Sequence, residues 1–362
     1  MRSVFSLLKI AVFAAVVAAP LTALAIGGPV LPYGQKPLPE FPTFRAIVQG
    51  KSGALDKFGE AVLDRSSVME AAIKVRNFAA YTANVTDTDR IIFGRDGWLF
   101  YKEELSCLDR KRLSTALDQV EAMIEAAKAG GIELIVSVSP DKGSIYPEKM
   151  HPLAKPYWAC KLQDNRIWRE ALAQHPNILD HAAPILADKE REPRAKLYFE
   201  TDTHWTTLGA SWAFRQLIGA ASHHKDIQLP DPRLTGETAA RPTDMANQML
   251  LLPGQESYDK IDMATEAGLA QLAGVPKRKT VVIHDSFYHV LGESFVPNFP
   301  GVTAFHLESD IDKYPAAIAG AERVIVNSIE RAFVSRVLDG SMSPNSPLGR
   351  AIQDRRNSRK QD

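Results

Sequence analysis

Two segments far apart in the 362-residue chain carry side chains that could perform acyl transfer together. The first contains Asp202 and His204, whose side chains can point to the same side of an extended or tightly turned backbone because one residue separates them. A carboxylate beside an imidazole can hold the ring through its Nδ1–H, which leaves Nε2 free to take a proton from a hydroxyl. The second segment contains Ser286, which follows a short β-branched run and is expected at the tip of a strand. Asp202, His204 and Ser286 are therefore the predicted catalytic triad.

Both segments also have other interpretations. An Asp two residues before a His is common in surface loops and caps, and an Asp-Ser pair after a strand often caps a helix. A metal site is a further alternative, because the two segments contain several nitrogen and oxygen ligands. These are Asp202, His204, His284, Asp285 and His289. Their spacing matches no HExxH motif or comparable ligand pattern, so the triad is favoured and neither a metal nor a cofactor is expected.

Four segments together resemble the alginate O-acetyltransferase group of periplasmic SGNH-hydrolase-like proteins. They read FGRDGWLFYKEE (93–104), SPDKGSIYPEKM (139–150), TDTHWTTLGA (201–210) and IHDSF (283–287). In that group the Asp-x-His motif precedes the serine, which reverses the order found in ordinary SGNH esterases. The resemblance covers roughly residues 86–340 and implies that Asp202, His204 and Ser286 are the acid, base and nucleophile. The chain departs from the pattern at His284 and Asp285, where smaller residues are expected before the serine.

The resemblance also implies a function. It points to an O-acetyltransferase that adds acetyl groups to an exopolysaccharide of the alginate kind through an acyl-serine intermediate. The implied partners are the exopolysaccharide acceptor and a membrane-bound acyltransferase that delivers acetyl groups across the inner membrane. The residues alone leave two alternatives open, because an acyl-serine can pass its acyl group to water as well as to a sugar. These alternatives are a carbohydrate esterase with the same triad and a non-catalytic polysaccharide-binding assembly protein.

Further candidate site residues lie at predicted strand ends, where parallel α/β sheets bind their ligands. The negatively charged oxygen of an acyl-transfer intermediate needs hydrogen-bond donors, and we expect them from the Ser286 backbone N–H and the Asn327 side chain. A groove for the sugar is expected between Trp205 and the loop that contains Lys142 and Tyr146. Aromatic faces can stack on sugars, although most aromatic side chains are core residues. The aromatic candidates are Trp98, Tyr146, Trp205 and Tyr288.

The alternation of helical and apolar extended segments predicts an α/β domain of three layers around a central, mostly parallel sheet. A hairpin is expected at 91–101, after packing helices within 54–83, and a surface excursion at 222–245. A polar tail, expected to be frayed, follows from residue 341. The predicted strands are 132–138, 178–180, a run starting at Thr280, 302–306 and 323–326. The predicted helices are 112–129, 164–175, 182–189, 206–221, 261–272 and 328–338.

The first 25 residues have the pattern of a secretory signal. Arg2 and Lys9 supply positive charge, residues 10–19 form a short apolar core, and Ala23-Leu24-Ala25 resembles a cleavage site. An uncleaved anchor is the alternative, although a membrane span needs about 20 apolar residues. A Gly/Pro-rich leader is expected to open the segment 26–85. We therefore expect a periplasmic protein, associated with the inner membrane if the signal stays attached.

Composition and cysteine content agree with an exported globular protein. The chain is 45% hydrophobic and 24% charged, and its 43 basic and 43 acidic residues give a net charge of +0. This balance argues against a nucleic-acid-binding protein, which would show a basic excess. The two cysteines, Cys107 and Cys160, are predicted to form a disulfide in an oxidising compartment, and two separately buried thiols are the alternative.

Overall fold

The computed structural model describes residues 14–15, 18–26, 38–83, 87–88, 90–223 and 227–360. The predicted signal segment and the Gly/Pro-rich leader are thus described only in part. Among the described residues, no helix has both the length and the apolar character needed to span a membrane. The chain divides into two compact units: unit 1 is Met1–Phe93 with Pro242–Gln255, and unit 2 is Gly94–Arg241 with Glu256–Asp362.

Unit 2 is built on a five-stranded sheet in the order β4-β3-β9-β7-β8, in which all neighbouring strands are parallel. The side chains of the central strands are almost all buried on both faces, as expected for a parallel sheet covered by helices on each side. The prediction of an α/β fold with a central parallel sheet is confirmed. The strands are β3 (Glu133–Ser139), β4 (Ile178–Asp180), β7 (Thr280–His284), β8 (Thr303–His306) and β9 (Arg323–Ile329).

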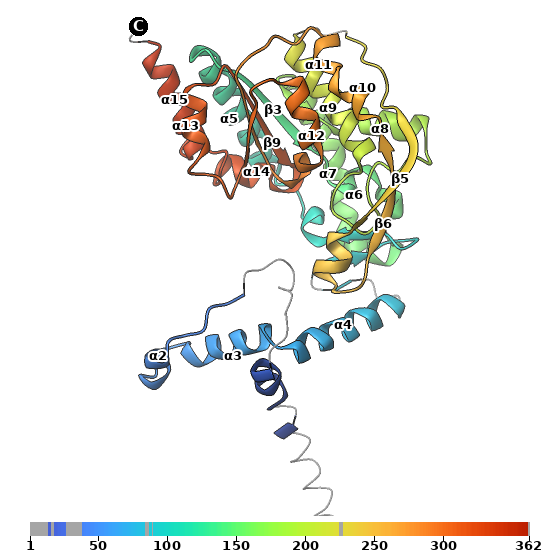
Figure 1. Cartoon of the computed structure of the whole chain (residues 1–362), viewed down its shortest axis with the longest axis vertical. Helices are drawn as coiled ribbons and strands as arrows, with labels where there is room; N and C mark the ends of the chain where they lie inside the picture. Colours follow the sequence, from blue (N-terminus) through green and yellow to red (C-terminus); the bar gives the residue numbers. More distant parts are fainter. Residues whose placement is uncertain are drawn as a thin grey trace, which may run out of the picture. The chain divides into compact units, whose positions relative to one another are not determined.

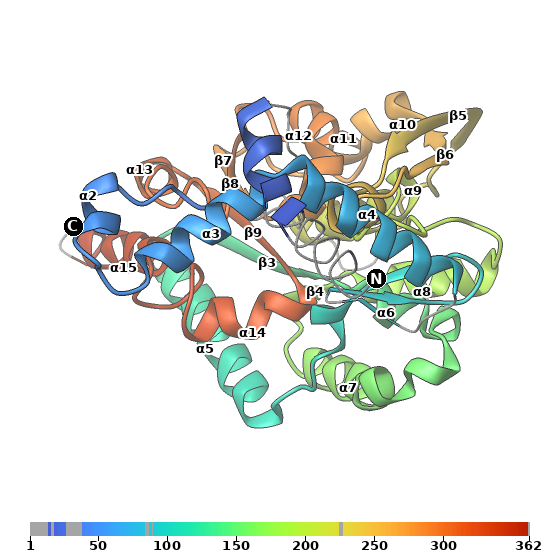
Figure 2. The same ribbon diagram turned by 90° about the horizontal axis from the view of Figure 1, so that it is seen from below.

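Helices cover both faces of this sheet and complete the three layers (Figures 1 and 2). On one face lie α5 (Arg110–Ala129), α7 (Lys155–Ala173), α13 (Tyr314–Ala319), α14 (Glu330–Leu338) and α15 (Pro347–Ser358). Their apolar side chains form one core with alternate residues of β3, namely Leu134, Val136 and Val138. On the other face lie α8 (Ala182–Arg191), α9 (Thr207–Ser222), α11 (Leu269–Leu272) and α12 (Gly292–Asn298), and α10 (Met263–Ala267) precedes α11.

Helix α5 shows how the sequence sets these elements. The Asp109 side chain accepts a hydrogen bond from the Arg112 N–H at 3.0 Å and thereby caps the first turn. Leu113, Leu117 and Val120 are spaced by four and three residues and are buried on one face. The helix ends at Gly130, and the following Gly131 has a positive φ of 73°, a conformation that favours glycine.

The C-terminal segment differs from its prediction. Residues 347–358 form helix α15, which packs on α5 and α13, so the expectation of a frayed tail is wrong. Ser346 accepts a hydrogen bond from the Gly349 N–H at 3.1 Å, and Pro347 occupies the first turn, where its missing N–H costs nothing. Leu348 and Ile352 are one turn apart and fully buried in the core. Together with the partly buried Ala351, these two residues dock a helix whose remaining surface is polar.

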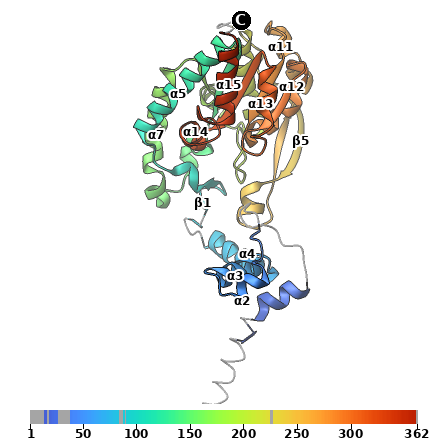
Figure 3. The same ribbon diagram turned by 90° about the vertical axis from the view of Figure 1, so that its left-hand side faces the viewer.

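The segment from 222 to 261 also differs from its prediction. It contains a two-stranded sheet, formed by β5 (Leu234–Pro242) and β6 (Gln255–Ile261), where we expected an irregular excursion up to residue 245. Figures 1 and 3 show the β5–β6 hairpin at the periphery of unit 2. Most of its side chains are exposed, so the sequence lacks the alternation of apolar and polar residues that marks a half-buried strand.

Unit 1 contains the packing helices expected within 54–83. They are α3 (Ala54–Asp64) and α4 (Ser67–Thr82), preceded by the short α2 (Phe44–Val48). The buried Asn77 side chain on α4 donates a hydrogen bond to the Leu250 carbonyl at 2.8 Å, which ties the 242–255 segment to this unit. Strand β1 (Ile91–Phe93) ends the first part of unit 1, and β2 (Leu99–Tyr101) follows in unit 2 after residues 94–98, where the hairpin was expected.

Cys107 and Cys160 form a disulfide, as predicted. Cys160 lies on α7, and Cys107 lies in the loop between β2 and α5. The bond closes a loop with a sequence separation of 53 residues. The disulfide thereby attaches the loop between β2 and α5 to helix α7, which covers one face of the sheet.

Replacing both cysteines by serine is expected to lower the free energy of unfolding by about 4 kcal/mol, because the disulfide limits the entropy of the unfolded chain. Urea unfolding of the wild type and the double variant, each with and without a reducing agent, measures this effect. The reducing agent should destabilise the wild type alone. A wild-type midpoint that ignores full reduction would show that the bond does not stabilise the fold.

Candidate active site

The structure brings the three predicted triad side chains into one hydrogen-bonded chain. The Ser286 Oγ lies 2.8 Å from His204 Nε2, and His204 Nδ1 lies 2.7 Å from Asp202 Oδ1. Asp202 is fully buried, His204 is partly buried, and Ser286 is exposed to solvent. The geometry thus places an acceptor nitrogen on an accessible hydroxyl and a carboxylate behind the ring.

A tight turn of the backbone positions Asp202 and His204. Tyr198 and Trp205 face each other in an isolated antiparallel bridge, and the Phe199 N–H donates to the His204 carbonyl at 3.2 Å. Within the turn the His204 N–H donates to Asp202 Oδ1 at 3.0 Å. The carboxylate therefore bonds the backbone and the ring of the same histidine, which fixes both.

The His284-Asp285 pair, where the sequence departs from the family pattern, organises the loop that carries Ser286. Asp285 Oδ1 accepts from the Phe287 N–H at 3.1 Å and caps the 3₁₀ helix Ser286–Leu291. Its Oδ2 accepts from the Ile329 N–H at 2.6 Å and from Arg336 at 2.7 Å. Asp285 thus ties the nucleophile loop after β7 to the end of β9. Helix capping by an Asp-Ser pair is one of the alternatives raised from the sequence, whereas the bonds of Asp285 to Ile329 and Arg336 were not expected.

The charge state of Asp202 suits a partner of the imidazole. Burial acts to raise its pKa, but the hydrogen bond and charge of His204 and the nearby Arg241 guanidinium lower the pKa to about 2. Arg241 Nη2 lies 3.3 Å from Asp202 Oδ2, on the side of the carboxylate away from the ring. Asp202 is therefore ionised at neutral pH and can stabilise a protonated His204.

The residues predicted to line a sugar groove are core residues instead. Lys142 is fully buried, and its Nζ donates to the Phe199, Glu200 and Asp202 carbonyls at 3.1, 2.8 and 2.8 Å. Trp205 is also fully buried and donates its indole N–H to the Phe287 carbonyl at 2.9 Å. The prediction of a groove between Trp205 and the 142–146 loop is wrong, because these side chains hold the two catalytic segments from within.

The four other candidate site residues, Trp98, Tyr146, Tyr288 and Asn327, are likewise buried. The Tyr146 hydroxyl accepts from the Leu197 N–H at 3.2 Å, and Trp98 packs against the Tyr146 ring. Asn327 lies inside β9, where its amide donates to Ser137 and Ser139 at 3.1 and 3.0 Å. The Tyr288 hydroxyl lies 2.8 Å from Ser137 Oγ and 2.6 Å from Nε2 of His181. The Asn327 Oδ1 accepts from Ser139 Oγ at 3.3 Å, so both ends of this amide are engaged within the sheet and its expected place beside the oxyanion is wrong.

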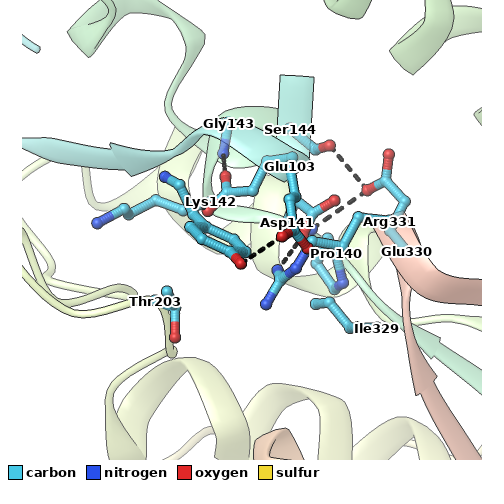
Figure 4. Close-up of polar contacts among 12 residues, drawn as sticks. Glu103, Pro140, Asp141, Lys142, Gly143, Ser144, Thr203, Ile329, Glu330 and Arg331 are labelled. Atoms are coloured by element: carbon cyan, nitrogen blue, oxygen red, sulfur yellow. Dashed lines mark hydrogen bonds and ion pairs between the residues drawn. The ribbon is translucent and has the colours of Figure 1, made fainter. Parts of the chain in front are cut away.

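A cluster of buried charges, which the sequence did not predict, lies at the carboxyl ends of β3 and β9. Figure 4 shows Asp141, Ser144, Glu330 and Arg331 with their polar groups directed toward one another. Glu330 bonds Lys161 at 2.8 Å and Ser144 at 2.7 Å, and Arg331 pairs with Asp141. Burial acts to raise the pKa of Glu330, but Lys161 and Arg169 lower it to about 2.

The same cluster joins the triad through Arg331 and Glu104. The Arg331 guanidinium lies 5.9 Å from the centre of the Phe287 ring, and that ring lies 4.9 Å from the His204 ring. Glu104 accepts from the Gly143 N–H at 3.0 Å, next to Lys142. Burial is the main reason that the pKa of Glu104 is raised to about 7. The cluster thus lies behind Phe287, which packs on the His204 ring, and behind the segment that contains Lys142.

Comparison with known proteins identifies the class of this domain. The family model described as "SGNH hydrolase-like domain, acetyltransferase AlgX" matches residues 91–326, so the chain belongs to this family. The probable alginate O-acetylase AlgJ of Pseudomonas putida is 26% identical over 243 residues, which are 62% of this chain and 60% of that protein. The probable alginate O-acetylase AlgJ of Pseudomonas syringae pv. tomato is 29% identical over 238 residues, and the match covers 62% of this chain and 59% of that protein.

The chain spans about three fifths of the length of these curated relatives. Among solved structures, the O-acetyltransferase domain of Pseudomonas putida AlgJ has a TM-score of 0.46 at 21% identity and covers 74% of this chain and 99% of its own. Pseudomonas aeruginosa AlgX has a TM-score of 0.46 at 15% identity, with coverages of 79% and 70%.

The buried ion pairs of Glu330 generate a stability prediction. We expect Glu330→Gln to cost about 3 kcal/mol at neutral pH, because it removes one carboxylate partner from the buried Lys161 and from Arg169. These two cations keep the carboxylates of Asp141 and Asp180, respectively. Since the folded-state pKa of Glu330 is below its ordinary value of 4.5, its contribution is present above that pH and is lost as the pH falls toward about 2. Urea unfolding at a series of pH values should therefore show a smaller acid loss in the variant.

The matched control is Asp339→Asn, which removes an ion pair with Arg112 whose two side chains are both exposed. This change should cost less than about 1 kcal/mol. An equal cost for the two variants would contradict the role assigned to the buried cluster.

Proposed function

We propose that this chain is an O-acetyltransferase that works through a Ser-His-Asp triad and an acetyl-serine intermediate. The observation that carries the proposal is the pair of hydrogen bonds made by the His204 ring. Its Nε2 lies 2.8 Å from Ser286 Oγ, and its Nδ1 lies 2.7 Å from Asp202 Oδ1. The exposure of Ser286 supports it, because the nucleophile must meet a donor from outside. The AlgJ proteins to which the chain is similar carry the name "probable alginate O-acetylase".

The reaction proceeds in two half-steps. His204 Nε2 takes the Ser286 proton while Oγ attacks the carbonyl carbon of an acetyl ester or thioester. The tetrahedral intermediate collapses, the bond to the leaving group breaks, and His204 returns the proton to that group, which leaves acetyl-Ser286. A hydroxyl of the acceptor then gives its proton to His204 and attacks the acetyl carbon, and Ser286 Oγ leaves and regains the proton. Asp202 stays ionised throughout and stabilises the imidazolium.

The backbone N–H of Ser286 is the proposed donor to the negatively charged oxygen of the intermediate. It lies at the start of the 3₁₀ helix, where an N–H has no partner within the helix. Loss of a preorganised donor of this kind costs about 3–4 kcal/mol of transition-state stabilisation. The Asp285 cap and its bonds to Ile329 and Arg336 keep this turn in place.

The acceptor that we propose is an exopolysaccharide of the alginate kind, and the donor partner is a membrane-bound acyltransferase. The periplasm is the proposed compartment. The signal-like pattern of residues 1–25 and the disulfide support export, because disulfides persist in oxidising compartments.

A carbohydrate esterase with the same three residues is the second candidate. It is favoured by the exposure of Ser286 together with the burial of the side chains that we expected to orient a sugar. Both candidates share the acetyl-serine and differ in the group that removes the acetyl. A transferase must hold the acceptor hydroxyl in line with the carbonyl so that it competes with water.

Alanine variants of the three residues test the triad. We expect Ser286→Ala and His204→Ala each to lower kcat for a small activated acetyl ester by at least about 10³-fold, and the double variant to be no worse, because the residues act as a unit. Circular dichroism should show that the variants are folded. Additive losses, or substantial turnover by Ser286→Ala, would refute the assignment.

Product partition separates the two candidate functions. The purified protein is mixed with an acetyl ester and an oligosaccharide of the alginate kind, and acetylated sugar and free acetate are both quantified. A transferase should yield acetylated sugar that increases with acceptor concentration at the expense of acetate. Acetate alone at every acceptor concentration would favour the esterase.

A further inference from the structure

One face of the β5–β6 hairpin contacts the turn that carries the triad acid. The partly buried residues of the two strands alternate, as Ala239 and Arg241 on β5 and Glu256 and Tyr258 on β6. This period of two gives the exposed hairpin a single inward face. Three of these four side chains contact residues 199–202, which we call the acid loop.

The contacts of the hairpin with the acid loop are specific polar and aromatic contacts. Glu256 Oε2 accepts from the Glu200 N–H at 2.8 Å, and its Oε1 accepts from the N–H and the hydroxyl of Thr201. Arg241 pairs with Asp202, and its guanidinium lies 5.1 Å from the centre of the Phe199 ring. The Tyr258 ring packs edge-on against Phe199 with centroids 5.4 Å apart.

The acid loop is therefore held from two sides. A positively charged side chain binds its carbonyl groups, and a negatively charged side chain binds its N–H groups. From the core, the ammonium of Lys142 binds the carbonyls of Phe199, Glu200 and Asp202. From the hairpin, the carboxylate of Glu256 accepts from the N–H groups of Glu200 and Thr201. Charge-assisted bonds of this kind are stronger than neutral ones. They leave the loop little freedom to shift the Asp202 carboxylate.

We propose that Arg241 and Glu256 are positioning residues of the active site, which act through Asp202 and the acid loop on His204. The inference rests on the proposed acyl-transfer function and extends it to a part of the chain outside the α/β core. Arg241 and Glu256 are also the residues that flank the 242–255 segment, at the points where the chain leaves unit 2 for unit 1 and returns. Two of the three points at which the chain crosses between the units thus adjoin residues that hold the acid loop.

The test uses the full chain and two single variants, Arg241→Gln and Glu256→Gln. Each should lower kcat for a small acetyl ester by about 10-fold and leave KM within about twofold, because a displaced acid loop impairs the chemical step and not ester binding. In Glu256→Gln, hydrogen exchange should be faster at the amides of Glu200 and Thr201, since an amide side chain offers one acceptor oxygen in place of two.

The matched control is Glu237→Gln on the same hairpin, whose exposed carboxylate pairs with the exposed Lys260 instead of the acid loop. It should leave both kcat and the exchange of the two amides at wild-type values. Arg241→Lys keeps the positive charge beside Asp202 but loses the planar guanidinium over Phe199, so its kcat should lie between those of the wild type and Arg241→Gln. This variant also keeps the proposal testable if Arg241→Gln fails to fold.

Unchanged exchange at Glu200 and Thr201 in Glu256→Gln, or kcat within twofold of wild type in both Gln variants, would overturn the positioning role. A loss in Arg241→Lys as large as that in a folded Arg241→Gln would overturn the role of the charge. Exchange is measured without turnover. A wild type without acyl-transfer activity would therefore refute the proposed function, while faster exchange would still support the hold on the acid loop.

Discussion

The hydrogen bond between the buried Asp202 carboxylate and the His204 ring is the interaction on which the rest of the site depends. A buried carboxylate is costly unless its charge is compensated, and here a histidine, an arginine and a backbone N–H compensate it. The compensation comes from elements that are distant in the sequence, since Arg241 lies on the peripheral hairpin. The ionised state of the acid is thus a property of the folded unit as a whole.

The parallel sheet explains how the nucleophile meets this pair. Strands β3, β7 and β9 end at the same edge, and Ser286 follows β7 directly. At that edge Asp285 ties the loop after β7 to Ile329 at the end of β9. Glu330 and its buried cations fill the space beside it and hold the loop after β3. The backbone beside Ser286 is therefore held by the hydrogen bonds of Asp285, while the Ser286 side chain is exposed to solvent.

The sequence predicted the elements with strong local patterns and failed where tertiary contacts decide. The parallel strands were found because their apolar runs are buried on both faces. Helix α15 was missed because only Leu348 and Ile352 are large apolar residues in an otherwise polar stretch, and two such residues give no clear period. The β5–β6 hairpin was missed because it is exposed and contacts the acid loop largely through polar side chains such as Glu256.

The same limit applies to the site. Asp202, His204 and Ser286 could be named from residue types and spacing, because acyl transfer restricts which groups can act. Lys142 and Trp205 were placed near the site but given the wrong role, since sequence position at a strand end does not tell whether a side chain points to solvent or to the core. A lysine that binds three carbonyls in the interior has no sequence signature.

The most direct test of this account is the covalent state of Ser286 during turnover. The protein is mixed with an acetyl ester, quenched in acid within the first turnovers, digested and analysed by peptide mass spectrometry. The account predicts that the peptide containing Ser286 gains the mass of one acetyl group, that fragmentation assigns it to the serine, and that it disappears when acceptor is added before the quench. An active wild-type protein whose Ser286 never carries an acetyl group would contradict it.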